Sequence, residues 1–251
     1  MPDVEEPLAG NVTAGVVRVG STVRRPAGPW TDSVDALLTH LARVGFTGAP
    51  RPLGRDDRGR QVLEYVPGEV GDSALGYPEP ELRAIGRMLR DYHDAAASFV
   101  PPPGAVWNRV IQPDREEIIC HHDPAPWNLV RAAGRWVLID WDAAGPGSRL
   151  WDLAYAAQSM VPLVPGGEPH LASARLRAFT DGYGLDADGR ERLPAMLGRR
   201  ARAMYALLRD GAAAGRQPWA RIWTEDGPYW RNTADYLDRS VAIWSAALTT
   251  P

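Results

Sequence analysis

The chain has 251 residues, 45% of them hydrophobic and 24% charged, and its formal net charge of -3 gives no electrostatic reason to expect nucleic acid as a partner. This length suits one large domain or a small lobe joined to a larger one, and no apolar run approaches the ~20 residues that span a bilayer. The acidic first ten residues do not resemble a secretory signal, and one cysteine, Cys120, excludes a disulfide framework and a multi-cysteine metal site, so we expect a cytoplasmic protein that acts on a small molecule.

The N-terminal quarter of the chain predicts strands around one helix. Residues 12–25 are rich in β-branched side chains interrupted by Gly20-Ser21, which indicates a hairpin. A helix is predicted from Thr31 or Asp32 to Gly45, because apolar residues recur at helical spacing, and the run 61–66 has strand character. We therefore predict a small β-rich N-terminal lobe with one helix over residues 1–66.

The remaining residues, 67–251, predict a larger and mainly helical lobe. A helix is expected over 81–96, a short hairpin over 128–140 with its turn near Gly134, and several helical runs after Trp151. The last run carries apolar or small residues at steps of three and four from Thr233 to Leu248. The order of elements indicates an α+β fold with the helices gathered in the second part.

The stretch ICHHDPAPWNLVRAAGRWVLID carries the chemistry. It contains the spacing H-x-D-x-x-x-x-N from His121 through Asp123 to Asn128, followed by Asp140 at the end of an apolar strand. A hairpin centred on Gly134 places Asn128 opposite Asp140, with their Cβ atoms ~5 Å apart on one face. An amide oxygen and a carboxylate would then converge as hard ligands of the kind that Mg²⁺ prefers, and Asp123 could accept a proton from an attacking hydroxyl group.

An isolated Asp and Asn before a strand are most often turn formers. Asp140 argues for the functional interpretation, because a carboxylate at the end of a buried strand is costly unless it is paired or bound to metal.

The same residues resemble the aminoglycoside phosphotransferase family, whose small-molecule kinases share a fold with protein kinases. In that family the H-x-D-x-x-x-x-N motif is the catalytic loop, and the following I-D corresponds to the metal-binding D-F-G of protein kinases. The resemblance implies that His121 braces the loop, that Asp123 is the catalytic base, and that Asn128 and Asp140 bind Mg²⁺. It implies a two-lobed protein-kinase-like fold and transfer of the γ-phosphoryl group of ATP or GTP to a hydroxyl of an antibiotic or metabolite.

Other matches extend the resemblance along most of the chain. LEYVPG resembles the family's hinge, where backbone groups of Glu64, Tyr65 and Val66 would hold the nucleotide base. The pattern L-x-x-x-G-x-x-L-x-x-x-H from Leu82 to His93 resembles its long central helix, and LWDLA, with Asp152, resembles the segment after the metal site.

The phosphate-binding lysine of the family has no counterpart, because all 28 basic residues are arginines. The segment TVRRP resembles a variant that places Arg24 in this role, with Arg25 as the less favoured candidate. The partner glutamate of the following helix is also missing, since Val34 occupies its position and only Asp32 and Asp35 lie near.

Two alternatives remain open from the sequence. The missing lysine and glutamate would suit a catalytically inactive nucleotide-binding module. A metal-dependent hydrolase could use His121, His122 and Asp123, although adjacent side chains diverge and the other histidines show no ligand spacing.

The acceptor is expected between the catalytic loop and the helices after Trp151. That part of the chain has 12 Arg and 11 Asp plus Glu, which argues weakly against a strongly cationic acceptor. Its arginine-rich helix, with Arg199, Arg200 and Arg202, is interpreted as a solvated face. Four aromatic residues could stack on an acceptor ring, although such spacing more often belongs to a core: Trp219, Trp223, Tyr229 and Trp230.

Overall fold

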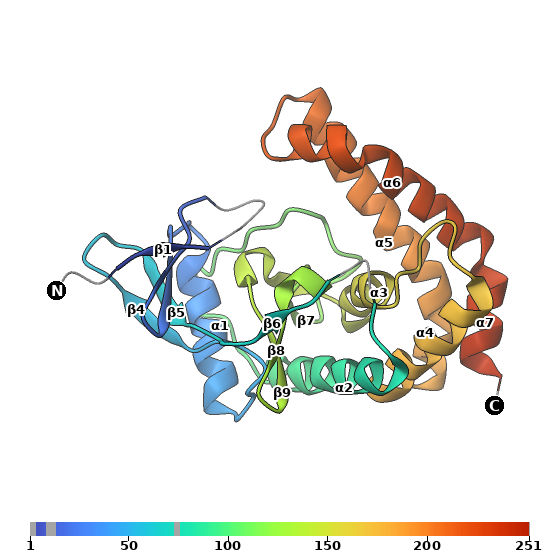
Figure 1. Ribbon diagram of the computed structural model, residues 1–251, viewed down its shortest axis with the longest axis horizontal. Helices are drawn as coiled ribbons and strands as arrows, with labels where there is room; N and C mark the ends of the chain where they lie inside the picture. Colours follow the sequence, from blue (N-terminus) through green and yellow to red (C-terminus); the bar gives the residue numbers. More distant parts are fainter. Residues whose placement is uncertain (1–3, 9–13, 73–75, 251) are drawn as a thin grey trace.

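The computed structural model describes residues 4–8, 14–72 and 76–250, and it begins with a five-stranded antiparallel sheet in the order β1-β2-β3-β5-β4 (Figure 1). The hairpin predicted at Gly20-Ser21 is confirmed, because Val19 pairs with Thr22 across a two-residue loop. Residues 12 and 13, with which the predicted hairpin segment begins, lie outside the described residues. The strands are β1 (Glu6–Pro7), β2 (Val17–Val19), β3 (Thr22–Arg25), β4 (Pro52–Arg55) and β5 (Gln61–Glu64).

The helix predicted after this hairpin is α1 (Thr31–Arg43), which ends just before Gly45. Its apolar face is buried and joins the main hydrophobic core that also contains the helices of the second part of the chain. The backbone contributes a further contact, since Leu138 N–H donates to the Gly48 carbonyl over 2.9 Å. The first sheet and its helix are therefore fixed against the segment that carries the predicted site.

Two small sheets, six α-helices and two short 3₁₀ helices follow among the described residues. One is a three-stranded sheet in the order β6-β8-β9, and the other is the short pair β10-β7. Figure 1 shows the first sheet and α1 at one end of the molecule and the antiparallel pair α5 and α6 at the other. The elements are β6 (Glu69–Val70), α2 (Glu79–Ala96), β7 (Ile118–Cys120), the 3₁₀ helix η1 (Pro126–Asn128), β8 (Leu129–Ala132), β9 (Arg135–Leu138), the 3₁₀ helix η2 (Trp141–Ala143), β10 (Gly145–Gly147), α3 (Arg149–Met160), α4 (Pro169–Tyr183), α5 (Ala187–Ala213), α6 (Trp219–Arg239) and α7 (Val241–Thr249).

This architecture confirms the predicted α+β class with a β-rich first part. The last helical run expected from the sequence is divided in two, because α6 ends at Arg239 and α7 starts at Val241. The boundary predicted between lobes at residue 66 stays a prediction.

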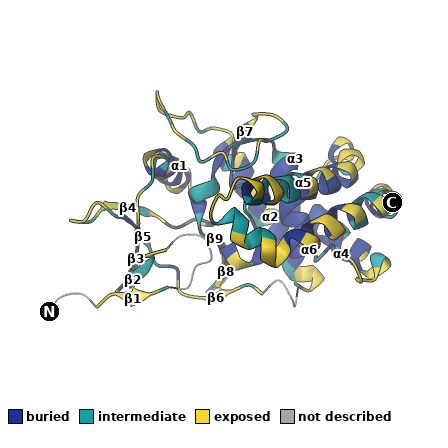
Figure 2. Ribbon diagram, turned by 90° about the horizontal axis from the view of Figure 1, so that it is seen from above, coloured by how far each residue is buried: buried dark blue, intermediate teal, exposed yellow. Residues whose placement is uncertain are grey.

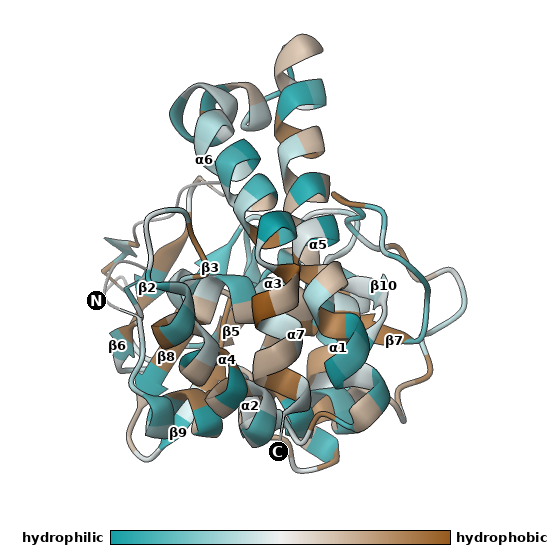
Figure 3. Cartoon of the chain, turned by 90° about the vertical axis from the view of Figure 1, so that its right-hand side faces the viewer, coloured by the Kyte–Doolittle hydropathy of each residue, from teal (hydrophilic) through white to brown (hydrophobic). Residues whose placement is uncertain are grey.

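The core is built around α2 and α3. Leu82, Ile85 and Leu89 are buried along one face of α2, as their helical spacing predicts, and nearly every residue of α3 is buried (Figure 2). Helices α2 and α4 approach closely at Gly86, where a methyl group would lie 2.2 Å from the Phe179 carbonyl oxygen. In Figure 3, helices α3 and α7 lie near the centre of the view and carry long apolar segments.

The hairpin of β8 and β9 corrects one prediction. Ala132 pairs with Arg135 across a two-residue loop in which Gly134 has a φ of +74°. Asn128 therefore lies opposite Ile139, whose N–H donates to the Asn128 carbonyl over 2.9 Å, and the prediction that it faces Asp140 is wrong by one residue. The error arose because a turn centred on one residue and a two-residue turn give registers that differ by one.

Among the described residues, no helix combines the length and the apolar character needed to cross a membrane.

Candidate active site

The predicted catalytic loop follows β7 and is held by Asp152 of α3. The Asp152 carboxylate accepts hydrogen bonds from the backbone N–H groups of His121, over 3.1 Å, and His122, over 2.8 Å. His93 of α2 donates a third through Nε2, over 3.1 Å. Burial by itself raises the pKa of Asp152, but the hydrogen bond and charge of His93, with the charges of His121 and His122, lower this pKa to about 2. Three elements distant in sequence thus converge on one buried carboxylate.

His121 connects this loop to the segment before Asp140. Its Nε2–H donates to the Ile139 carbonyl over 3.0 Å, its Nδ1 accepts from the Asp123 N–H over 3.3 Å, and its ring packs edge-on against Trp141. Burial lowers the pKa of His121, so the ring is neutral near pH 7. These contacts suit the bracing role that the resemblance implies.

The Asp123 carboxylate is surrounded by hydrogen-bond donors. Asn128 Nδ2 donates to its Oδ2 over 2.7 Å, and the side chains of Tyr155 and Trp127 also hydrogen-bond to it. Burial raises the pKa of Asp123 to about 6, against the opposing effect of the Tyr155 hydrogen bond. The carboxylate therefore ionises near neutral pH, as a general base requires.

Asn128 and Asp140 do not face one another across the hairpin. Asn128 ends η1, and its amide nitrogen is engaged by Asp123, which leaves the carbonyl oxygen Oδ1 as a possible metal ligand. Asp140 follows β9 in the left-handed conformation, with a φ of +58°, and its Oδ1 accepts from Arg25 Nη2 over 2.9 Å. The two oxygen donors therefore come from consecutive loops rather than from a strand pair.

The two candidate phosphate-binding arginines point to opposite faces of β3. Arg24 lies against Asp56, with 3.6 Å between Nη1 and Oδ2, on the face that it shares with Val17. Arg25 is buried and donates to both Asp140 and Asp142. The geometry thus favours Arg25, the less favoured candidate from the sequence, as the cation beside the predicted metal ligands.

The acidic residues of α1 are hydrogen-bonded to a different arginine, Arg55. Arg55 of β4 donates to Asp32 over 2.5 Å and to Asp35 over 2.6 Å. The carboxylates that contact Arg25 are instead those of Asp140 and Asp142.

At the predicted hinge, the chain passes from β5 toward β6. The backbone N–H groups of Glu64 and Tyr65 donate to the carbonyls of Arg51 and Ser21. Val66 is buried against Val130 and Val137 in a small separate apolar cluster.

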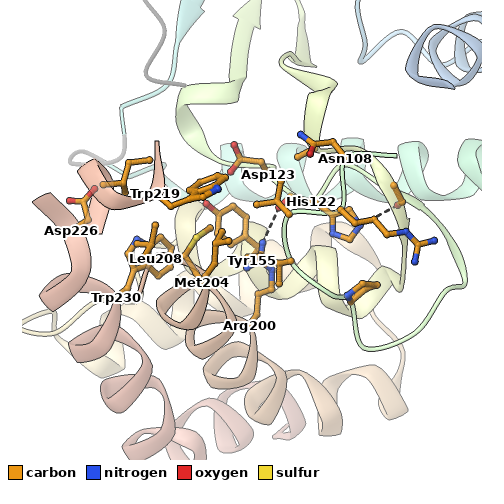
Figure 4. Close-up of a pocket in the computed structure, with 18 of the residues that line it drawn as sticks. Asn108, His122, Asp123, Tyr155, Arg200, Met204, Leu208, Trp219, Asp226 and Trp230 are labelled. Atoms are coloured by element: carbon orange, nitrogen blue, oxygen red, sulfur yellow. Dashed lines mark hydrogen bonds between the residues drawn. The ribbon is translucent and has the colours of Figure 1, made fainter. Parts of the chain in front are cut away.

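A cavity of about 350 Å³ opens beside Asp123, where the sequence predicted the acceptor (Figure 4). The catalytic loop, the segment 108–113, α3, α5 and α6 all contribute to its wall. Of the four aromatic residues considered as stacking partners, Trp219 and Trp230 line it, whereas Trp223 packs against Tyr205. Tyr229 lines an adjacent cavity that shares Trp127, Asp226 and Trp230 with the first.

Three residues of the site were missed by sequence reasoning. Tyr155 lies three residues after Asp152 on α3, a spacing that could have placed both on the loop-facing side of that helix. Trp127 adjoins Asn128 in the motif itself. Arg200, predicted as solvated, is instead buried in the cavity wall, and no local pattern distinguishes it from the exposed Arg199 and Arg202.

The histidines do not form the centre that a metal-dependent hydrolase would need. His122 Nε2–H points to the carbonyls of Gly145 and Pro146, away from the contacts of His121. Among the described residues, His93, Cys120 and Asp152 are close enough to share a metal ion. The first and last hydrogen-bond to each other, and Cys120 Sγ–H donates to the Ser148 carbonyl, so hydrogen bonds account for this cluster.

Comparisons with known proteins bear on the family and the fold of this chain. Residues 105–194 match the model of the phosphotransferase enzyme family. The trifolitoxin immunity protein of Rhizobium leguminosarum bv. trifolii is 36% identical over 192 residues, which cover 71% of this chain and 73% of that protein.

Two solved kinases share the fold over nearly all of both chains. A choline/ethanolamine kinase family protein from Mesorhizobium loti has a TM-score of 0.65 at 17% identity and covers 100% of this chain and 94% of its own. The amicoumacin kinase in complex with AMP-PNP, Ca²⁺ and Ami has a TM-score of 0.67 at 13% identity, covering 96% and 90%. The fold is therefore that of the kinase-like phosphotransferases, and the chain belongs to the phosphotransferase enzyme family.

Proposed function

We propose that this protein transfers the γ-phosphoryl group of ATP or GTP to a hydroxyl group of a small molecule bound in the cavity beside Asp123. The position of that carboxylate carries the proposal. Tyr155, Trp127 and Asn128 fix it at the cavity wall, and burial brings its pKa to about 6. There it can orient an acceptor hydroxyl and accept its proton as the phosphoryl group is transferred.

Asn128 and Asp140 would hold Mg²⁺. Their donor atoms suit this ion, because Asn128 keeps Oδ1 and Asp140 keeps its second carboxylate oxygen outside the hydrogen bonds described above. When bound, Mg²⁺ supplies positive charge to the β- and γ-phosphates. Asn128 would also couple this site to Asp123, since its amide group contacts the carboxylate.

Arg25 would contact the nucleotide phosphates in place of the absent lysine. Its guanidinium is already directed toward the site by Asp140 and Asp142, and a planar fork can bind phosphate oxygens in pairs. Arg24 remains the alternative. The nucleotide base would lie at the backbone of Glu64, Tyr65 and Val66, where Val66 and its neighbours offer an apolar surface.

The acceptor would be an antibiotic or a metabolite with an apolar or aromatic face. Trp219 and Trp230 could stack on it, and Asp226 and Arg200 lie in the same wall, so the cavity carries charges of both signs. The names of two similar proteins, an immunity protein and an antibiotic kinase, make inactivation of a toxic compound the first class to test.

The test is a screen for phosphoryl transfer from ATP and GTP to a panel of antibiotics, sugars, nucleosides and amino alcohols, with and without Mg²⁺. Asp123→Asn should lower kcat by about 10²–10⁴ while nucleotide affinity is unchanged, because the base contacts the acceptor. Asp94→Asn, an exposed carboxylate on α2, serves as the matched control.

Three results would contradict the proposal. Asp123→Asn could retain more than about a tenth of the rate. The wild type could bind Mg-nucleotide tightly without any turnover, which would favour an inactive module. Activity without nucleotide in a protein that carries a transition metal would favour a hydrolase.

A further inference from the structure

Arg200 of α5 is a buried cation beside the candidate catalytic loop. Only 2% of the residue is exposed, and its guanidinium carbon lies 4.3 Å from the ring centroid of Tyr155 and 5.4 Å from that of Trp151. Its Nη2 donates to the His122 carbonyl oxygen over 3.0 Å. The Nε and Nη1 groups are buried without a hydrogen-bond partner among the described residues.

This placement is costly, because a buried guanidinium loses its hydration and here gains no direct carboxylate partner in the described structure. The aromatic faces of Tyr155 and Trp151 and the nearby charges of Asp123 and Asp152 offset part of that cost. A methionine would occupy much of the same space without this penalty. The contacts that Arg200 makes therefore indicate a specific role.

The residue that Arg200 contacts has a constrained backbone. His122 adopts a φ of +66°, a left-handed conformation that is uncommon for residues other than glycine. Its N–H is held by Asp152 of α3, its ring by the carbonyls of Gly145 and Pro146, and its carbonyl oxygen by Arg200. The next residue in the chain is Asp123.

A second route links Arg200 to the same carboxylate. Figure 4 shows the Tyr155 ring between Arg200 and Asp123. The guanidinium lies over the face of that ring, while the Tyr155 hydroxyl hydrogen-bonds to Asp123. One side chain of α5 thus contacts both the backbone before Asp123 and a donor to its carboxylate.

We infer that Arg200 is a positioning residue, which fixes Asp123 against the acceptor cavity through the His122 carbonyl and the Tyr155 ring. The inference rests on the proposed function, since it assigns Arg200 to the same transfer reaction. Arg200 need not touch the acceptor or the nucleotide in this role. Its loss should therefore lower kcat and leave the KM for the nucleotide unchanged.

The first experiment compares Arg200→Met and Arg200→Lys with Arg199→Met, which removes an exposed arginine from the adjacent position of the same helix. Phosphoryl transfer is measured with the best acceptor of the panel, or with water if none is found. Arg200→Met should lower kcat by about 10- to 100-fold, the cost of a small misplacement of a reacting group, and Arg199→Met should match the wild type. Equal kcat values for Arg200→Met and Arg199→Met would overturn the inference.

Chemical rescue separates positioning from a general loss of folding. In Arg200→Ala the missing group leaves space beside the cavity, and millimolar guanidinium chloride should restore part of kcat. It should restore nothing in Asp123→Asn. A low kcat in Arg200→Ala that guanidinium does not raise would count against the positioning role of Arg200. If Arg200→Met does not fold, kcat is compared between Arg200→Lys and Arg199→Met instead.

Hydrogen exchange followed by mass spectrometry tests whether Arg200 holds the loop at His122 and Asp123, and it requires no activity measurement. Residues 119–129 should exchange faster in Arg200→Met than in Arg199→Met, while peptides from α2 exchange equally in both. Unchanged exchange in this loop would overturn the inference. If the loop exchanges faster but the wild type transfers no phosphoryl group, the positioning role of Arg200 on the loop is supported and the proposed function fails.

Discussion

Replacing Asp152 by asparagine tests whether one buried carboxylate holds the candidate catalytic loop. The substitution preserves the size of the side chain and removes its charge. An asparagine offers one acceptor oxygen in place of two, and its NH₂ group would face the N–H donors of His121, His122 or His93. At least one buried donor is then left without a partner.

The size of the effect follows from the pKa of Asp152. This pKa falls from 3.8 to about 2 on folding, which at about 1.4 kcal/mol per pKa unit corresponds to about 2 to 3 kcal/mol of stability. An unpaired buried donor costs about 1–3 kcal/mol more. We therefore expect Asp152→Asn to lower the free energy of unfolding by about 3 kcal/mol or more, and to reduce turnover because the loop loosens.

The sign of the pH dependence is fixed by the depressed pKa. The charge of Asp152 stabilises the fold fully above pH 3.8, and this contribution is lost as the pH falls from 3.8 toward about 2. The difference in stability between wild type and Asp152→Asn should therefore shrink as the pH falls below about 4.

Urea unfolding at several pH values, followed by circular dichroism, measures this difference. Asp94→Asn is the control, because Asp94 is half-exposed and its ion pairs with Arg90 and Arg149 should contribute at most about 1 kcal/mol. A loss of less than about 1 kcal/mol in Asp152→Asn, or one equal to that of Asp94→Asn, would refute the conclusion that Asp152 holds the candidate catalytic loop.

Three further predictions concern the reaction. Arg25→Met should lower kcat/KM for the nucleotide by about 10- to 100-fold, the value of a charge-assisted hydrogen bond, whereas Arg24→Met should have little effect; equal kinetics would remove Arg25 from this role. Tyr155→Phe removes a hydrogen bond that lowers the pKa of Asp123, so the acid limb of the pH-rate profile should move from about pH 6 to higher pH, and a limb that stays in place would contradict this. Trp219→Ala should raise the KM for the acceptor but not the KM for the nucleotide, because Trp219 lines the cavity. Steady-state kinetics with both substrates varied measures the two constants. An unchanged KM for the acceptor would contradict the assignment of this cavity as the acceptor site.

Local sequence patterns were sufficient for the elements and for the identity of the motif. Turn residues such as Gly20-Ser21 and the apolar spacing of α1 and α2 define structures whose interactions lie within a few positions along the chain. The spacing from His121 to Asn128 is local as well, so the family and the fold class could be predicted, and a catalytic loop proposed, before any tertiary contact was known.

Local patterns did not determine the register of the β8–β9 hairpin. Gly134 indicated a turn, but the sequence did not distinguish a loop centred on it from the two-residue loop that the structure contains. Because side chains alternate across a strand, that difference of one residue moved the expected partner of Asn128 from Asp140 to Ile139.

Tertiary structure alone decided which arginines matter. Arg25 meets Asp140 across 115 residues and Arg200 meets His122 across 78. Their neighbours in sequence differ from them, because Arg24 lies against Asp56 and Arg199 is exposed near the Trp151 ring. Adjacent residues on a strand or helix have the same local context, and their burial depends on which face packs against distant segments. The motif could therefore be identified from sequence, but the cations around it are assigned by packing between parts of the chain that no local pattern relates.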